Sequence, residues 1–119
     1  MRKYQIFILL MAMFMLAGCA NRFVENSYKT LAVSKETYNS TLDIAGDLYR
    51  QGHVEEAQKE KAIEYGTTYM IVHNEAVASL LEYELNENED AKQRFIDTLS
   101  DVLSRLSYLI DYVKGLKGE

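Results

Sequence analysis

The stretch VENSYKTLAVSKETYNSTLDIAGDLY, residues 24–49, decides the fold class of this 119-residue chain. Apolar and aromatic residues recur in it at alternating spacings of four and three, which keeps them on one face of an α-helix. The series consists of Val24, Tyr28, Leu31, Lys35, Tyr38, Leu42, Ala45 and Tyr49. Lys35 alone breaks the apolar pattern, and we interpret it as a side chain whose stem lies along this face while its ammonium group reaches water. The flanking residues are mostly small and predict close approach of neighbouring helices: Ser27, Ala32, Ser34, Thr41 and Gly46.

Two further helices are expected after this one. Gly52 interrupts the pattern, and glycine ends a helix at low cost because it adopts the left-handed backbone conformation readily. A second helix is expected from about residue 54 to 85, and the polar run 86–90 separates it from a third, with Asn88 or Asp90 as the N-cap. The third helix repeats the spacing of four and three in Phe95, Leu99, Val102, Leu106, Leu109, Val113 and Leu116.

Short connections make consecutive helices antiparallel, so the predicted fold is all-α, an up-down-up antiparallel three-helix bundle with coiled-coil-like seams. Its helices are expected at about residues 22–51, 54–85 and 90–116. The chain contains no proline, which agrees with long uninterrupted helices.

The N-terminus holds the single cysteine of the chain, Cys19, and one cysteine cannot close an internal disulfide. Arg2 and Lys3 precede an apolar run, IFILLMAMFML, that is shorter than the roughly 20 residues a membrane-spanning helix needs. The following LAGC, residues 16–19, resembles the lipobox of bacterial lipoproteins. The resemblance implies that residues 1–18 are a cleaved signal peptide. It also implies that Cys19 becomes the lipid-modified first residue of a mature domain, residues 19–119, and incorporates palmitate.

The lipobox resemblance implies a place in the bacterial cell envelope, with the membrane as a partner through the lipidated Cys19. In lipoproteins of this kind an aspartate directly after the cysteine usually signals retention in the inner membrane, and this chain has Ala20 at that place. The resemblance therefore implies that a cell with two membranes would carry the protein on the periplasmic face of its outer membrane. An uncleaved N-terminal anchor is the alternative, and it would also keep the protein on a membrane. The mature part resembles the many short helical bacterial lipoproteins, a likeness that implies no particular activity.

The charge of the chain argues against nucleic acid as a partner. The formal net charge is −5, and removal of residues 1–18 takes away Arg2 and Lys3 but none of the 18 acidic residues, which brings it to −7. No nucleophile with a neighbouring base and no phosphate-binding loop is present in the sequence, so no catalytic residue, no cofactor and no enzymatic activity are expected.

His73 is the residue most open to a second interpretation. It lies at the centre of the apolar face of the second helix, and we expect it to be buried and hydrogen-bonded, with a tyrosine as the candidate partner. A metal site would want a carboxylate at the i−3 position, where Met70 stands, so no metal ligand is assigned. A periplasmic binder of a small ligand or metal that uses His73 and core tyrosines nevertheless remains the alternative function.

The main functional hypothesis is a non-enzymatic binding or structural module that acts through a helical surface. The second helix is apolar over an arc of roughly 200°, more than two neighbouring helices need to cover. Ile63, Met70 and Val77, with Ile71 nearby, are therefore the candidate surface for a partner protein or a second copy of the chain. Full burial of the second helix is the competing interpretation of the same pattern.

Overall fold

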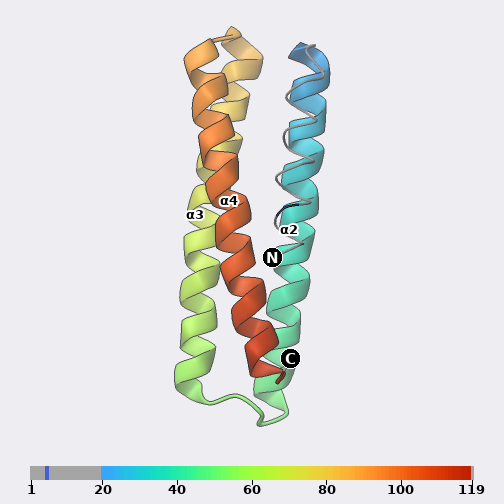
Figure 1. Ribbon diagram of the computed structural model, residues 1–119, viewed down its shortest axis with the longest axis vertical. Coiled ribbons are helices and arrows are strands. Elements are labelled where there is room, and N and C mark those ends of the chain that lie inside the picture. The colour runs from blue at the N-terminus through green and yellow to red at the C-terminus, as the bar shows by residue number, and fades with distance from the viewer. Residues whose placement is uncertain (1–4, 6–19, 119) are drawn as a thin grey trace.

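A computed structural model describes residue 5 and residues 20–118. Three long helices make up the described bundle: α2 (Ala20–Arg50), α3 (Glu56–Asn86) and α4 (Glu89–Leu116). They run alternately down, up and down (Figure 1), so the predicted all-α, up-down-up three-helix bundle is confirmed. The bundle measures 49 × 26 × 17 Å, and its length is close to that of a single 31-residue helix at about 1.5 Å per residue.

The two connections are short and specifically capped. Gly52 has a φ of 77°, which confirms its expected left-handed conformation after α2. The side chain of Glu55 caps the backbone of α3 while the Gln58 side chain accepts from the Glu55 N–H at 2.9 Å, so α3 begins two residues later than predicted. At the start of α4 the Asn88 side chain accepts from the Asp90 N–H at 2.9 Å, which confirms Asn88 as the N-cap.

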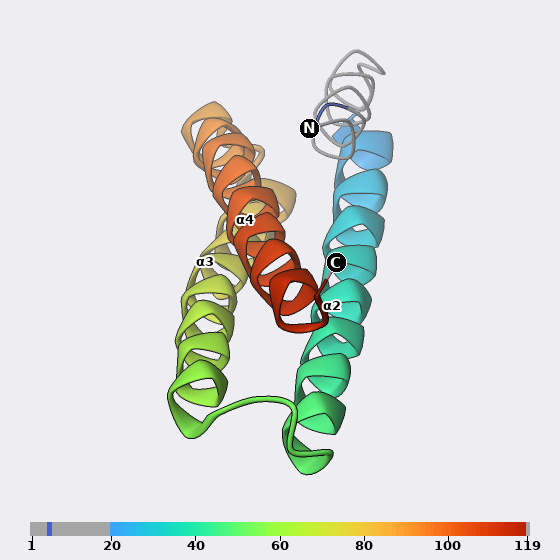
Figure 2. The ribbon, with the colours of Figure 1, turned by 60° about the horizontal axis from the view of Figure 1, so that its bottom comes forward.

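Helices α3 and α4 form the most extensively packed pair of the bundle. The seam predicted for α4 is confirmed from Phe95 to Val113, all of whose members are at most 4% exposed, whereas Leu116 is half-buried. It packs against an α3 face that includes Tyr69, Ala76 and Leu80, each 0% exposed. Figure 2 shows these two helices together on one side and α2 on the other.

The buried face of α2 is centred on different residues from those predicted. Most of the predicted series is only half-buried, and Tyr49 is exposed. The buried residues of this helix are Phe23, Ser27, Leu31, Ser34, Thr41 and Ala45. Small side chains let the α2 backbone come close to its neighbours, and the longer tyrosine, lysine and leucine side chains reach along the edges of the interface. The hydroxyl groups of Ser34 and Thr41 tolerate burial because each donates to a carbonyl of its own helix, at 2.9 and 2.7 Å.

Phe23, which the sequence pattern missed, connects all three helices. Its ring makes edge-on contacts with Tyr83 of α3 at 5.7 Å between centroids and with Phe95 of α4 at 5.9 Å. Perpendicular aromatic pairs of this kind are favourable because the positive edge of one ring meets the negative face of the other. The Lys92 ammonium lies 4.9 Å from the Phe23 centroid and covers the cluster from the solvent side.

Candidate functional site

The residues predicted to carry function lie in three places. Cys19, the predicted lipidation site, lies outside the described residues. The residues of the predicted partner surface lie along α3, two of them exposed and two half-buried. His73 lies in the interface between α2 and α3, and the same interface opens into a pocket near the α2–α3 connection.

The four residues proposed as a partner surface do not form a single patch. Ile63 and Ile71 are each 55% exposed, whereas Met70 and Val77 are half-buried and pack against the core cluster. At about 100° per residue, Ile63, Met70 and Val77 lie within about 40° of one another, and Ile71 lies about 100° further round the helix than Met70. The structure therefore groups three of the residues and separates Ile71 from them.

Two leucines that were not in the proposed set extend the grouped three. Leu81 is 46% exposed and Leu85 is 71% exposed, and both fall on the same side of α3 by helical position. We call this set the α3 edge, and its members are Ile63, Met70, Val77, Leu81 and Leu85. The α3 edge covers about 33 Å along the helix, since each residue adds about 1.5 Å.

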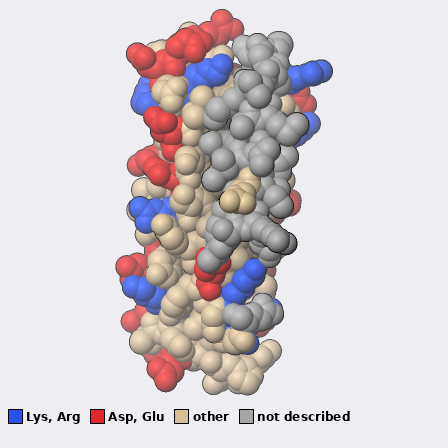
Figure 3. Space-filling model, in the orientation of Figure 1, with Lys and Arg blue, Asp and Glu red and all other residues tan. Residues whose placement is uncertain are grey.

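Acidic side chains are exposed along much of the length of this helix. Glu64, Glu75 and Glu84 are exposed on α3, and no lysine or arginine occurs between Lys61 and Lys92. In the orientation of Figure 3 acidic side chains gather at the top of the molecule, where α3 meets α4, and the bottom is mostly uncharged. These carboxylates give the exposed side of α3 a negative potential, while the Lys35 ammonium group of α2, 3.2 Å from the Met70 sulfur, places one positive charge at the middle of the α3 edge.

A polar and aromatic cluster fills the middle of the α2–α3 interface. The rings of Tyr38 and Tyr69 stack at 4.5 Å between centroids, and the Tyr69 hydroxyl lies 2.8 Å from the Ser34 hydroxyl. The Lys35 ammonium donates to the Met70 sulfur at 3.2 Å and lies 5.5 Å from the centroid of Tyr38, so this half-buried lysine runs along the interface. Burial raises the pKa of both tyrosine hydroxyls above the ordinary value, so the cluster supplies no phenolate near neutral pH.

His73 lies beside this cluster, with its ring centroid 5.6 Å from that of Tyr69. Both ring nitrogens are buried and have no hydrogen-bond partner among the described residues, so the expected hydrogen bond to a tyrosine is wrong. The neighbouring Tyr69 hydroxyl is paired with Ser34 instead. Burial lowers the pKa of His73 below its ordinary value, the Leu31 carbonyl opposes this without completing a hydrogen bond of normal geometry, and the charge of Lys35 lowers the pKa further.

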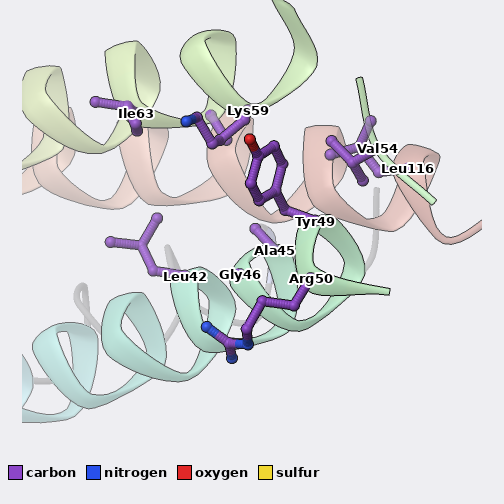
Figure 4. A pocket seen from close by; sticks show the side chains of 10 residues that line it. Leu42, Ala45, Gly46, Tyr49, Arg50, Val54, Lys59, Ile63 and Leu116 are labelled. Carbon is purple, nitrogen blue, oxygen red and sulfur yellow. The ribbon is translucent and has the colours of Figure 1, made fainter. Parts of the chain in front are cut away.

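A pocket of about 280 Å³ opens between α2 and α3 near their connection. Its walls are mainly apolar and include Leu42, Ala45, Val54, Ala62, Ile63 and Leu116. Figure 4 shows Leu42 of α2 and Ile63 of α3 facing each other across it, with Val54 and Leu116 at the far end. Val54 is 8% exposed in the connection itself, so the chain crossing from α2 to α3 closes that end of the pocket.

Two cations belong to the pocket lining, Lys59 from α3 and Arg50 from α2. The Lys59 ammonium lies 4.5 Å from the ring centroid of Tyr49 and 2.8 Å from the Glu56 carboxylate, which in turn accepts from the Tyr49 hydroxyl at 2.7 Å. The Glu56 carboxylate raises the pKa of Lys59, and Lys59 followed by Tyr49 lowers the pKa of Glu56. Arg50 forms an ion pair with Asp47 one turn earlier in α2.

The described side chains supply binding surfaces but few reactive groups. Within residue 5 and residues 20–118, no three histidine, cysteine or acidic residues come close enough to hold a metal ion. No described helix is both long and apolar enough to cross a membrane. Comparisons of the chain with protein-family models, with curated proteins and with solved structures found no match.

The sequence pattern predicted neither the pocket nor the hydrogen bond between the Ser34 and Tyr69 hydroxyl groups. Ala45, Gly46 and Ala62 are small residues on facing helices, and this was the signal available for the pocket. Small residues can bring two helices together or leave a space between them, depending on the angle at which the helices cross. That angle cannot be inferred from the spacing of residues along one helix.

Proposed function

We propose that this protein is a lipid-anchored protein of the bacterial cell envelope that binds a partner without catalysis. The proposed occupant of the α3 edge is a basic amphipathic helix of another protein. The observation that carries the proposal is the exposure of Ile63, Leu81 and Leu85, at 55%, 46% and 71%, on a helix whose core-facing residues Tyr69, Ala76 and Leu80 are each 0% exposed.

The geometry of the α3 edge suits a helix better than an extended strand. The five members of the α3 edge are spaced by seven, seven, four and four positions, which keeps them on one side of α3. They can therefore contact the apolar side chains at positions i, i+3, i+4 and i+7 of an amphipathic partner helix. Met70 and Val77, in the middle of the edge, are half-buried, whereas Ile63 at one end and Leu81 and Leu85 at the other are exposed. The flexible thioether of Met70 adapts to partner side chains of different shape.

The charge beside the α3 edge selects the chemistry of the partner. Glu84 is exposed beside the α3 edge, and Glu64 and Glu75 are exposed further round α3, so lysine or arginine on the flank of an incoming helix would meet a negative surface. A second copy of the chain would bring the same acidic flanks together, which like-charge repulsion disfavours. The charge therefore favours a basic partner over a homodimer through this edge.

The lipid anchor is a separate part of the proposal and rests on the LAGC sequence that ends at Cys19. Since α2 begins at Ala20, an acylated Cys19 would hold the N-terminal end of α2 at the membrane. The α3–α4 connection lies at that same end of the bundle (Figure 1), and its acidic residues would disfavour close contact with anionic lipid head groups. Ala20 after the cysteine favours the outer membrane in a cell with two membranes.

Binding is tested with two synthetic helical peptides that share one leucine face and differ only in their flanks, lysine in one and glutamate in the other. Full-length protein in uncharged lipid nanodiscs is titrated with each peptide and the affinity is measured by fluorescence anisotropy. We expect the lysine peptide to bind at least about tenfold more tightly, with an affinity that falls as salt rises. Equal affinities for the two peptides would overturn the proposed partner chemistry.

The site is tested by Leu81→Lys combined with Leu85→Lys, which changes two exposed residues outside the core. A matched control, Val33→Lys with Tyr108→Lys, changes residues that are 54% and 56% exposed on the other two helices. The first pair should abolish binding of the lysine peptide and the control pair should retain it. The anchor is tested by Cys19→Ser, which should abolish incorporation of labelled palmitate, and unchanged labelling would contradict the anchor alone.

A further inference from the structure

We propose that the pocket between α2 and α3 binds a free medium-chain carboxylate, with the apolar chain inside and the carboxylate group at Lys59. This inference does not depend on the proposed partner. Ile63 belongs to both sites, but the other members of the α3 edge do not line the pocket, which lies near the α2–α3 connection (Figure 4).

The pocket arises because facing residues are too small to fill the space between the helices. Ala45 and Gly46 of α2 and Ala62 of α3 line it, and larger side chains, among them Leu42 and Ile63, form the rest of its walls. A Cβ atom added at Gly46 would meet no protein atom closer than the Arg50 guanidinium at 3.5 Å. The α2 wall therefore has room for additional atoms without disturbing the core.

The size and walls of the pocket suit a short hydrocarbon chain. A volume of about 280 Å³ exceeds the roughly 150 Å³ of a cavity that binds benzene, so the pocket has room for a short linear hydrocarbon chain. A linear chain of this length would replace water along Leu42, Ala62 and Leu116, and each buried methylene would contribute to affinity through the hydrophobic effect. The two acyl chains of a phospholipid exceed this volume.

The charges of the lining select an anionic head group. Among the described residues its charged lining members are Lys59 and Arg50, both cationic. Lys59 is held beside Tyr49 by the Glu56 carboxylate, so its ammonium group is already positioned at the pocket before a ligand arrives. A ligand carboxylate would add a charge-assisted hydrogen bond to this ammonium group, which a neutral or cationic head group cannot form.

The test uses photoreactive ligands on the full-length chain in uncharged lipid nanodiscs. Decanoate, decanol and decyltrimethylammonium, each with a diazirine near the tail, are crosslinked and the labelled peptides are identified by mass spectrometry. Decanoate should label peptides that contain residues 42–49 and 59–63, and it should do so at least about fivefold more strongly than the other two ligands. Equal labelling by all three ligands would overturn the proposal.

Two pairs of variants identify the site. Gly46→Leu fills the pocket wall and should reduce the labelling at least about fivefold, whereas Gly115→Leu adds the same side chain on α4, where no atom lies within 4 Å of the new Cβ. Lys59→Gln should remove the preference for decanoate over decanol, and Lys61→Gln, outside the lining, should leave it intact. Unchanged labelling in Gly46→Leu, with helicity retained by circular dichroism, would overturn the proposal even if the peptide-binding tests succeed.

Discussion

The hydroxyl groups of Ser34 and Tyr69 lie 2.8 Å apart in the buried interface between α2 and α3. Ser34 also donates to the Leu31 carbonyl at 2.9 Å, so the Tyr69 hydroxyl is the donor of the pair. This pair joins the loosely packed α2 to the α3–α4 pair at a position where Tyr69 is 0% exposed. The Tyr69 hydroxyl is therefore bonded to Ser34 and not to the neighbouring His73, for which a tyrosine was the expected partner.

The two ends of this hydrogen bond should respond differently to substitution. Ser34→Ala leaves the buried Tyr69 hydroxyl without an acceptor, which should cost about 1–3 kcal/mol of unfolding free energy. Tyr69→Phe leaves Ser34 bonded to the Leu31 carbonyl and should cost about 1 kcal/mol. Urea unfolding followed by circular dichroism measures both values. A larger loss in Tyr69→Phe than in Ser34→Ala would contradict this donor assignment.

His73 should make stability depend on pH. Burial lowers its pKa in the folded chain below the ordinary 6.5 of the unfolded chain, so the unfolded state binds the proton first as the pH falls. The stability is therefore complete above pH 6.5 and is lost as the pH falls through that value toward the folded-state pKa. Urea unfolding between about pH 5 and pH 7.5 measures the slope.

Two variants test whether His73 causes this dependence of the unfolding free energy on pH: His73→Leu, and His53→Gln as the control. His73→Leu should flatten the pH dependence and should not reduce stability at neutral pH, because the two buried ring nitrogens lack partners among the described residues. His53 is exposed in the α2–α3 connection, and its replacement should leave the slope in place. The assignment to His73 fails if both variants keep the slope of the unmodified protein.

Gly66 should be needed for close contact between α2 and α3. A Cβ atom at this position would lie 3.3 Å from the Tyr38 hydroxyl oxygen and 3.4 Å from its ring, so Gly66→Leu should force the helices apart and cost about 1–3 kcal/mol. Gly115→Leu meets nothing within 4 Å of its Cβ and should stabilise α4 by up to about 1 kcal/mol. Thermal unfolding of the two variants compares the same added side chain in the two positions, and similar melting temperatures would refute the contact.

Glu87 stores a local backbone strain that glycine should relieve. Its φ of 49° and ψ of 34° place it in the left-handed region at the end of α3, where residues with a Cβ pay about 1 kcal/mol or more. Glu87→Gly should therefore raise the unfolding free energy by about 1 kcal/mol, whereas Glu75→Gly in the exposed interior of α3 should lower it by a similar amount. Chemical denaturation of both variants tests the opposite signs.

The sequence by itself determined the three helices and their order. Spacings of four and three, the absence of proline and the turn signals at Gly52 and Asn88 are local features, so they appear directly in the chain. The seam of α4 was predictable for the same reason, because that helix contacts two neighbours and its apolar residues are large enough to be recognised as core.

Only the tertiary structure decided which side of α2 is buried, what surrounds His73 and where a pocket opens. Burial of Ser27, Ser34 and Thr41 depends on how closely α2 approaches the α3–α4 pair, and that distance is fixed by side chains from all three helices. The ring nitrogens of His73 lack a partner among the described residues, and the hydroxyl of its neighbour Tyr69 donates to Ser34, 35 positions earlier in the sequence. These outcomes follow from packing between segments far apart in the chain, and residue spacing within one helix contains no information about the distance between two helices.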